Sequence, residues 1–277
     1  MNSLGKNALL GLYKYSGAMH AQEKLAYWAG QRFMTIVLFH RVTDEIPVDG
    51  LTVSTAWFRE YCALMRSRFH VIPLAELHRI LQTGATPPMR TIAITFDDCY
   101  RDNLSAARVL SEHGLHATFF VPTRYVGTDH VFEWDVGLKK MPNLTWDDVK
   151  EIQSLGHEIG SHTVTHADLG AIDAADVRWE LAESKKVLEN ELGRPVRYLA
   201  YPFGGRGNFR PEYLGLSREI GYEACVSAYG GFVQPHLRGQ VLPREAMPYF
   251  RSLLHLEVYL SGCLDWLYQM RRRVGSI

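Results

Sequence analysis

The sequence predicts an α/β protein with a mainly parallel sheet, and three observations support this. Apolar, β-rich runs of strand length alternate with segments of helical periodicity, an order typical of βαβ units. The 277 residues are enough for one α/β barrel or for two smaller domains. With 47% hydrophobic and 22% charged residues, the composition is that of a folded protein, which excludes a largely disordered chain.

The expected strands are short apolar segments, each followed by a turn or a helical pattern. The clearest is 91–96, which is apolar almost throughout, as expected for a strand covered on both faces. The expected strands are 35–40, 91–96, 117–121, 158–161, 198–201 and 222–227.

The expected helices have apolar residues at helical spacing and recognisable ends. The helix over 104–113 stops at Gly114, a residue favoured just after a helix. Thr145 and Asp148 have the spacing of a capping box at the start of another helix. The expected helices are 55–67, 74–81, 104–113, 145–155 and 175–192.

The two ends of the chain lie outside this alternating pattern. We expect a helical extension over 1–32, an α/β domain over 33–250 and a C-terminal helix over 251–277. Three arginines at 271–273 would suit the end of that helix through its dipole. The alternative is a peripheral contact of this helix with anionic lipid.

The composition excludes some classes of protein, as the net charge, the cysteines and the hydropathy each show. The 30 basic and 30 acidic residues balance, which argues against a general nucleic-acid binder. The four cysteines include no C-x-x-C pair, so we expect free thiols, as in a reducing compartment. No apolar run reaches the roughly 20 residues that span a bilayer, and the apolar stretch near the N-terminus is short for a secretory signal. We therefore expect a cytoplasmic protein without a transmembrane segment, with secretion as the alternative.

Two adjacent carboxylates, Asp97 and Asp98, stand where the most apolar strand ends. Active sites of α/β folds gather at the carboxyl ends of strands, where both side chains can turn toward one pocket. Because two like charges in one site repel each other, we expect a cation nearby. The alternative is a helix N-terminus, where carboxylates gain from the helix dipole.

Two histidines, His162 and His166, follow another short strand. At i and i+4 they would lie on the same side of a helical turn and could bind one metal ion. The alternative is a pair of unrelated surface histidines. Together with the carboxylates they describe a hydrolytic metal centre with an open position for water.

The segments Thr-Phe-Asp-Asp at 95–98 and Ser-His-Thr-Val-Thr-His at 161–166 resemble the first two motifs of a known family. This family comprises the polysaccharide deacetylases related to the nodulation chitooligosaccharide deacetylase, carbohydrate esterase family 4. The resemblance covers about residues 35–250, and the further similar segments are 118–121, 156–160 and Tyr-Pro-Phe-Gly at 201–204. It implies a distorted (β/α) barrel of about seven parallel strands.

The resemblance also implies an activity and a set of roles. Family members remove acetyl groups from N-acetylated sugars, in a polysaccharide, an oligosaccharide or a lipid-linked glycan precursor. Asp98, His162 and His166 would bind a divalent metal, commonly zinc, with cobalt, nickel or manganese as alternatives. Asp97 would be the general base for the metal-activated water, and the backbone N–H of Phe203 would stabilise the oxyanion.

The sequence departs from the family pattern at several points. Cys99 stands where the first motif usually has glycine, and Ala200-Tyr201 replaces the arginine before the third motif's proline. The only Asp-Trp pair late in the chain, at 265–266, lies in the expected C-terminal helix and is discounted. We hypothesise that Arg244, which stands roughly where the family's Leu-x-x-His would be, orients Asp97, the alternative being a surface arginine.

The usual Leu-x-x-His of the general acid is also absent. His40, which ends the first strand, is the favoured candidate for this role, and His236 is the second. Tyr201, Pro202 and Trp134 are candidate substrate-binding residues, although tryptophan in a loop often fills a local core.

Two other functions remain open at this stage. Some relatives hydrolyse formamides or cyclic amides of small molecules, and the altered third motif could belong to such a site. A carbohydrate-binding protein without catalysis is the other alternative. The retained base and ligand set favours the hydrolase.

Overall fold

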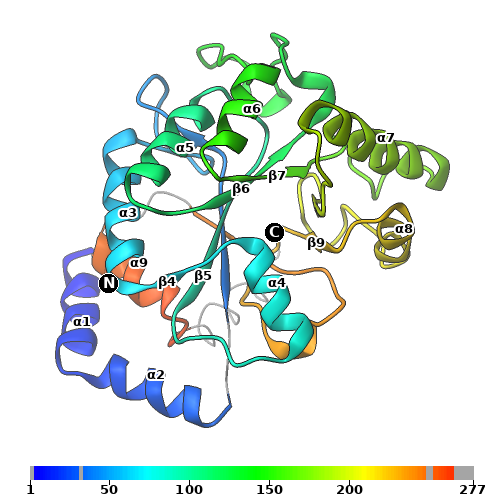
Figure 1. Cartoon of the computed structure of the whole chain (residues 1–277). Coiled ribbons are helices and arrows are strands. Elements are labelled where there is room, and N and C mark those ends of the chain that lie inside the picture. The colour runs from blue at the N-terminus through cyan, green and yellow to red at the C-terminus, as the bar shows by residue number, and fades with distance from the viewer. Residues whose placement is uncertain (1–2, 31–33, 248–251, 265–277) are drawn as a thin grey trace.

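The computed structural model describes residues 3–30, 34–247 and 252–264. A curled parallel sheet forms its centre, with strands in the order β10-β1-β5-β6-β7-β8-β9 and β4 beside β5 (Figure 1). Its strands are β1 (Thr35–Phe39), β4 (His70–Val71), β5 (Thr91–Phe96), β6 (Ala117–Val121), β7 (Glu158–Ser161), β8 (Tyr198–Ala200), β9 (Ala224–Val226) and β10 (Glu245–Ala246). The predicted distorted α/β barrel of parallel strands is confirmed.

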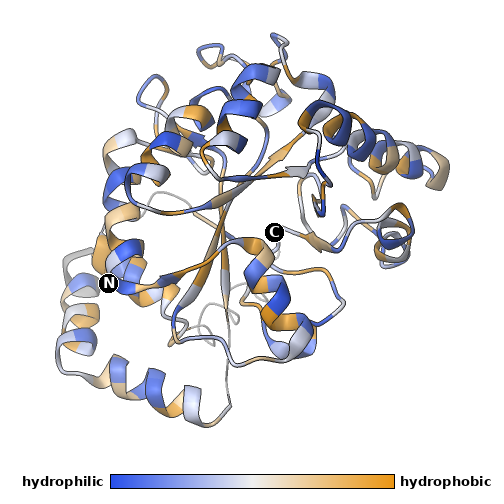
Figure 2. Cartoon of the chain, viewed as in Figure 1, coloured by the Kyte–Doolittle hydropathy of each residue, from blue (hydrophilic) through white to orange (hydrophobic). Residues whose placement is uncertain are grey.

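The strand side chains alternate between two apolar layers, as the two-residue period of a strand requires. Val37, Ile94 and Phe119 belong to the outer layer, which packs against the surrounding helices. Ile36 and Phe120 belong to the inner layer, inside the curl of the sheet. Both layers are buried, which explains why the strands are continuously apolar in the sequence. Figure 2 shows the apolar residues concentrated along these strands.

The helices after the strands cover the outer face of the sheet (Figure 1). They are α3 (Thr55–Arg68), α5 (Asp102–Glu112), α6 (Trp146–Ser154), α7 (Ala174–Leu192) and α8 (Glu212–Ile220). The four of these helices that were expected agree with the predicted bounds to within two residues at both ends. Helix α8 was not expected. The capping box of Thr145 and Asp148 at the start of α6 is confirmed, with both reciprocal hydrogen bonds present.

One helix, α4 (Leu74–Thr83), packs differently from the others. Its apolar residues join the inner layer together with Tyr198, the first residue of β8. The helix therefore closes the barrel at the amino ends of the strands. Short elements complete the fold: β2 (Arg41–Val42) paired with β3 (Thr52–Val53), and the 3₁₀ turns η1 (Thr123–Tyr125), η2 (Glu133–Asp135) and η3 (Pro235–Leu237).

The expected N-terminal extension is helical, with α1 (Ser3–Tyr15) and α2 (Ala18–Trp28) separated at Gly17. Helix α1 packs against α9 (Leu253–Leu260), so the N-terminal extension and α9 lie together (Figure 1). The rest of the expected C-terminal helix, its arginines at 271–273 and its proposed lipid contact lie outside the described residues. The division into an extension, a domain and a C-terminal helix stays a prediction.

Two further expectations concern the whole chain. All four cysteines are buried and unpaired, as predicted from their spacing. Within the part of the chain that the structure describes, no helix is both long enough and apolar enough to cross a membrane.

Candidate active site

Asp97 and Asp98 follow β5 directly, where the backbone turns sharply. The N–H of Asp97 donates to the carbonyl oxygen of Phe39 at 3.1 Å, so Asp97 continues the strand and faces inward like Thr95. Continued alternation would send Asp98 outward. Instead, Asp98 and Cys99 have φ angles of 75° and 54°, in the left-handed region, and this turn brings both carboxylates into one buried site.

This turn also explains why the position of Cys99 is usually glycine in the first motif of the family that the sequence resembles. Glycine adopts a positive φ without steric cost, which accounts for the glycine expected there, whereas a side chain adopts it only when its surroundings impose it. Cys99 is buried, and its backbone carbonyl accepts the N–H of Leu144 at 2.8 Å. Its thiol is not part of the Asp/His cluster that forms the candidate metal site.

The segment with the two histidines is an irregular loop after β7, so the prediction of a helical turn was wrong. Thr163 and His166 have φ angles of 66° and 56°, which interrupt any right-handed helix. The same two residues fold the loop back on itself, and the imidazole centroids of His162 and His166 lie 4.8 Å apart. The predicted proximity therefore arises from a different local structure.

Hydrogen bonds from neighbouring elements fix this loop. Glu180 of α7 accepts the backbone N–H groups of Val164 and Thr165 at 2.7 and 2.9 Å. Nδ1 of His162 lies 2.8 Å from the carbonyl oxygen of Ala200. Because a carbonyl can only accept, Nδ1 carries the proton and Nε2 is free to coordinate a metal ion.

Asp98, His162 and His166 form a compact cluster whose ligand atoms all lie within 4.8 Å of one another. Oδ1 of Asp98 lies 3.4 Å from Nε2 of His162 and 3.3 Å from Nε2 of His166. Zinc–ligand bonds of about 2.0–2.1 Å in a tetrahedral site require ligand atoms about 3.3–3.4 Å apart. The three side chains therefore fit a zinc-like divalent ion.

The hydrogen bonding of Asp98 supports the same assignment. Its Oδ1 is one of three buried side-chain polar atoms without a hydrogen-bond partner among the described residues. An unsatisfied buried acceptor costs free energy, and in native structures it usually has a specific reason. A metal ion bound between this oxygen and the two imidazoles would supply the missing partner.

Asp97 is held by a different partner, the fully buried Arg244. Nη1 and Nη2 of Arg244 donate to Oδ1 and Oδ2 of Asp97 at 2.8 and 2.6 Å, a bidentate pair. The guanidinium is itself held by the carbonyl oxygen of Ser227 at 2.6 Å and lies 5.3 Å from the centroid of the Phe120 ring. The hypothesised contact between Arg244 and Asp97 is present, and Arg244 is not a surface residue.

The partners of the two carboxylates determine their ionisation. Burial raises the pKa of Asp97, but the Arg244 guanidinium outweighs burial and holds this pKa below its usual value. Burial likewise raises the pKa of Asp98, and the His162 and His166 imidazoles hold it well below the usual value. Both carboxylates are therefore ionised at neutral pH.

A cavity of about 270 Å³ opens in front of these groups. The candidate acid His40 lines this cavity, whereas the second candidate, His236, lines another one. Burial lowers the pKa of His40, against the opposing effect of Asp98 and Asp97. The lining residues are Leu38, His40, Leu51, Asp97, Asp98, Trp134, His162, His166, Tyr201, Phe203, Ala228 and Ala246.

The third-motif residues occupy different positions relative to the cavity. Phe203 has a φ of 60° and a ring that is 51% exposed, and its backbone N–H has no acceptor among the described residues. Tyr201 contributes to the lining, but its hydroxyl is buried against Ser217 and its ring stacks on Phe209. Pro202 is buried and is not among the lining residues.

Trp134 lies against His166 and is held there by a series of hydrogen bonds. Its ring centroid is 5.3 Å from that of His166, and its Nε1 donates to the hydroxyl of Tyr100 at 3.0 Å. That hydroxyl donates to Oδ2 of Asp135 at 2.6 Å, and Oδ1 of Asp135 accepts from the buried Arg41. The position of Trp134 therefore depends on three polar residues that lie behind it.

Sequence reasoning missed the supporting residues Glu180, Tyr100 and Asp135. Each lies far from its partner in the chain, so no local motif identifies it. Arg41 gave one usable signal. An arginine that closely follows an apolar strand must be paired if it is buried, and Asp135 next to a tryptophan was a candidate partner.

The fold and the site together define a class of protein: a distorted parallel barrel with an Asp/His/His cluster beside a buried Asp–Arg pair at its carboxyl end. A sequence profile described as polysaccharide deacetylase matches residues 84–225, half of the chain. The chain belongs to the polysaccharide deacetylase family.

Individual relatives agree with this assignment. A Bacillus subtilis protein is 25% identical over 203 residues, which are 72% of this chain and 65% of that protein. The chitooligosaccharide deacetylase of Bradyrhizobium sp. is 29% identical over 139 residues, 48% of this chain and 54% of the relative. The chain thus spans less than two thirds of the length of these relatives.

Solved structures share the fold. The Streptococcus pyogenes deacetylase PplD, in complex with acetate, has a TM-score of 0.67 at 22% identity and covers 78% of this chain and 92% of its own. A polysaccharide deacetylase from Bacillus cereus has a TM-score of 0.68 at 20% identity, with 83% and 69% covered.

Proposed function

We propose that this protein is a metal-dependent deacetylase that hydrolyses the N-acetyl group of a sugar in a polysaccharide, an oligosaccharide or a lipid-linked glycan precursor. One observation carries the proposal. The unpartnered Oδ1 of Asp98 lies 3.3–3.4 Å from two imidazole nitrogens, next to a second carboxylate that is held away by Arg244. Family membership supports the same reaction class.

Asp98, His162 and His166 would hold the divalent metal, for which zinc is the best candidate. When bound, the metal polarises the acetyl carbonyl and lowers the pKa of water, which makes water a nucleophile at neutral pH. Three protein ligands leave a coordination position open, as in catalytic rather than structural zinc sites.

The surrounding residues divide the proton transfers between them. Asp97, kept ionised by Arg244, takes one proton from the attacking water as its oxygen bonds to the acetyl carbon. The N–H of Phe203, which has no acceptor among the described residues, donates to the oxyanion that forms. His40 takes up the proton held by Asp97 and gives it to the sugar nitrogen as the carbon–nitrogen bond breaks, so acetic acid and a free amine leave.

The cavity shape suits a sugar in this position. Trp134 and the exposed Phe203 ring both face the cluster, with their centroids 5.9 Å apart. Aromatic faces of this kind can pack against the apolar face of a sugar ring. We assign Trp134 and the Tyr201 segment to substrate binding, whereas the buried Pro202 acts only by shaping the turn before Phe203.

The test is acetate release from N-acetylglucosamine oligomers by the purified, zinc-loaded protein. We expect turnover that a chelator removes and zinc restores. Asp97→Asn should lose at least about 100-fold in kcat while still binding zinc, because it removes only the base. His40→Gln should also slow turnover.

Two results would overturn the proposal. Tight zinc binding without hydrolysis of any N-acetylated glycan would indicate a carbohydrate-binding protein. Turnover of a formyl or cyclic amide, with no acetate released from sugars, would indicate a small-molecule amide hydrolase. Normal turnover of His40→Gln would exclude His40 as the acid but leave the reaction class intact.

A further inference from the structure

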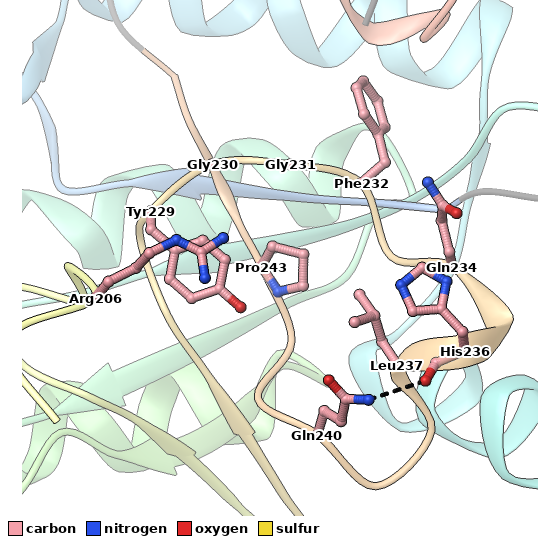
Figure 3. A pocket seen from close by; sticks show the side chains of 10 residues that line it. All are labelled: Arg206, Tyr229, Gly230, Gly231, Phe232, Gln234, His236, Leu237, Gln240 and Pro243. Atoms are coloured by element: carbon pink, nitrogen blue, oxygen red, sulfur yellow. Dashed lines mark hydrogen bonds between the residues drawn. The ribbon is translucent and has the colours of Figure 1, made fainter. Parts of the chain in front are cut away.

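A second cavity of about 600 Å³ lies beside the candidate active site. Figure 3 shows that its lining comes from three segments: Arg206 after β8, the chain from Tyr229 to Gln240 after β9, and Pro243 before β10. Its volume is within the range of about 300–1,000 Å³ typical of ligand pockets, whereas the 270 Å³ catalytic cavity is below it. The catalytic cavity thus has space for one reacting sugar unit and little more.

The two cavities are neighbours along the chain. Ala228 lines the catalytic cavity and Tyr229 lines the second one. On the other wall, Phe203 lines the first cavity and Arg206 lines the second. The N–H of Ala228 donates to the carbonyl oxygen of Gly204 at 2.9 Å, so the two walls are joined at the rim between the cavities. A glycan chain leaving the catalytic cavity across this rim would enter the second cavity.

The second cavity carries an uncompensated positive charge. The guanidinium carbon of Arg206 lies 4.2 Å from the centroid of the Tyr229 ring. Among the described residues, no carboxylate lies within ion-pair distance of Arg206, unlike Arg41 and Arg244. None of the ten residues that line the cavity is acidic.

Tyr229 contacts the guanidinium of Arg206 in the lining of the cavity. The Tyr229 hydroxyl donates to the carbonyl oxygen of Val241 at 3.2 Å, and its ring stacks on Phe209 at 6.4 Å between centroids. A ring fixed in this way positions the cation over its face without neutralising it. Arg206 is therefore exposed, placed against a fixed ring and free of an ion-pair partner among the described residues, so its charge is available to an anion.

The rest of the lining can bind sugar hydroxyl groups. Gln234, His236 and Gln240 contribute an amide, an imidazole and a second amide (Figure 3). The Nε2 of Gln240 donates to the carbonyl oxygen of His236 at 3.1 Å, which leaves the amide oxygen of Gln240 as an acceptor. A single guanidinium matches the single charge and the two oxygens of a carboxylate.

We propose that this cavity is a second glycan subsite, in which Arg206 binds the carboxylate of a sugar acid that neighbours the N-acetylated unit. The inference rests on the proposed function and narrows its substrate class to oligomers in which N-acetylated sugars and sugar acids are linked. The subsite would raise affinity for such a chain without taking part in the hydrolysis.

The experiment compares acetate release from two oligomers of equal length. One is the neutral N-acetylglucosamine oligomer, and the other alternates N-acetylglucosamine with glucuronate. We expect Arg206→Gln to raise KM about tenfold for the acidic oligomer, the loss of one hydrogen bond to a charged group. Its effect on the neutral oligomer should be at least fivefold smaller, and Arg206→Lys should restore part of the affinity.

Arg210→Gln is the matched control. Arg210 belongs to the same loop and lies over the ring of Tyr213 at 5.9 Å, but it does not line the cavity. We expect this variant to treat both oligomers like the wild type. Equal effects of Arg206→Gln on both oligomers, or none, would overturn the subsite while the proposed function stands. Absence of acetate release from both oligomers with the wild type would instead count against the proposed function.

Discussion

The two ends of the parallel sheet bury carboxyl groups in opposite ways. At the carboxyl ends, Asp97 lies against Arg244, and Asp98 lies against two imidazoles. At the amino ends, where α4 closes the barrel with apolar side chains, Glu158 of β7 has the hydroxyl of Thr118 as its hydrogen-bond partner at 3.0 Å. The carboxyl end of the sheet therefore holds charged groups beside an open cavity. At the amino end, which α4 closes, the carboxyl group of Glu158 has a hydroxyl as its hydrogen-bond partner.

All of these carboxyl groups are buried at least in part, so their partners decide whether each one is charged at neutral pH. Burial raises the pKa of Glu158 to about 7, because a hydroxyl and the more distant Arg197 compensate only part of the lost hydration. Asp97 is more deeply buried, yet its pKa is lowered because Arg244 faces it directly. At the carboxyl ends of the strands, Asp97 and Asp98 therefore stay negatively charged, although burial alone would favour their protonated forms.

The largest effect is expected from removal of the cation. Arg244→Met leaves Asp97 buried and unpaired, so we expect the free energy of unfolding to fall by about 3–5 kcal/mol. Urea denaturation measures this change. The control is Arg178→Met, which breaks an exposed ion pair with Glu219 and should cost at most about 1 kcal/mol. Equal losses in the two variants would show that the buried pair has no special role.

The second prediction separates the two adjacent carboxylates. Asp98→Asn should weaken zinc binding by more than about 100-fold, since loss of a ligand should exceed the 10–100-fold typical of groups that only orient ligands. Asp97→Asn should change zinc affinity much less, because its side chain lies on Arg244. Isothermal titration calorimetry with zinc measures both. A similar loss in both variants would mean that both carboxylates hold the ion.

Much of this end of the molecule could be predicted from the sequence. Strand bounds such as Thr91–Phe96 follow from an uninterrupted apolar run, and the positions of Asp97 and Asp98 follow from where that run stops. Parallel strands place their carboxyl ends at one edge, so the meeting of Asp98 with His162 was predictable as well. The need for a cation near two like charges was also predictable, and Arg244, hypothesised for this role from the family pattern, contacts Asp97.

The parts that could not be predicted depend on backbone turns and on contacts distant in the chain. The left-handed conformations of Asp98, Thr163 and His166 depend on the surrounding structure, because any residue with a side chain adopts them at a steric cost. The i, i+4 spacing of the histidines therefore suggested a helix that does not form. The hydrogen bond from Tyr100 to Asp135, and those from the backbone of the histidine loop to Glu180, cannot be read from the local sequence.

A third prediction concerns the support of Trp134. Tyr100→Phe removes the hydroxyl that links Trp134 to Asp135, so we expect KM for the glycan to rise by up to about tenfold with a smaller change in kcat. Tyr213→Phe is the control, since the buried Tyr213 hydroxyl has no partner among the described residues. In the double variant with Trp134→Phe the effects should not add. Additive effects would place Tyr100 outside the support of Trp134.

The last prediction concerns the protonation of Glu158 at the amino end of the sheet, and its expected effect is small. The folded protein binds the Glu158 proton more tightly than the unfolded chain, with a pKa of about 7 against 4.5. The stability contributed by this proton is therefore complete below pH 4.5 and is lost as the pH rises toward about 7. Glu158→Gln removes this dependence, because glutamine stays neutral.

We therefore expect Glu158→Gln to raise the melting temperature relative to the wild type by about 2–4 °C more at pH 8 than at pH 5, equivalent to roughly 1 kcal/mol. Partial exposure of Glu158 keeps this gain small, and Arg197 and Glu223, which also face it, oppose each other. Glu219→Gln, at an exposed ion pair, should show no such dependence on pH. If Glu158→Gln gave the same difference at both pH values, Glu158 would be ionised in the folded protein, and burial at this end would be compensated as fully as it is at Asp97.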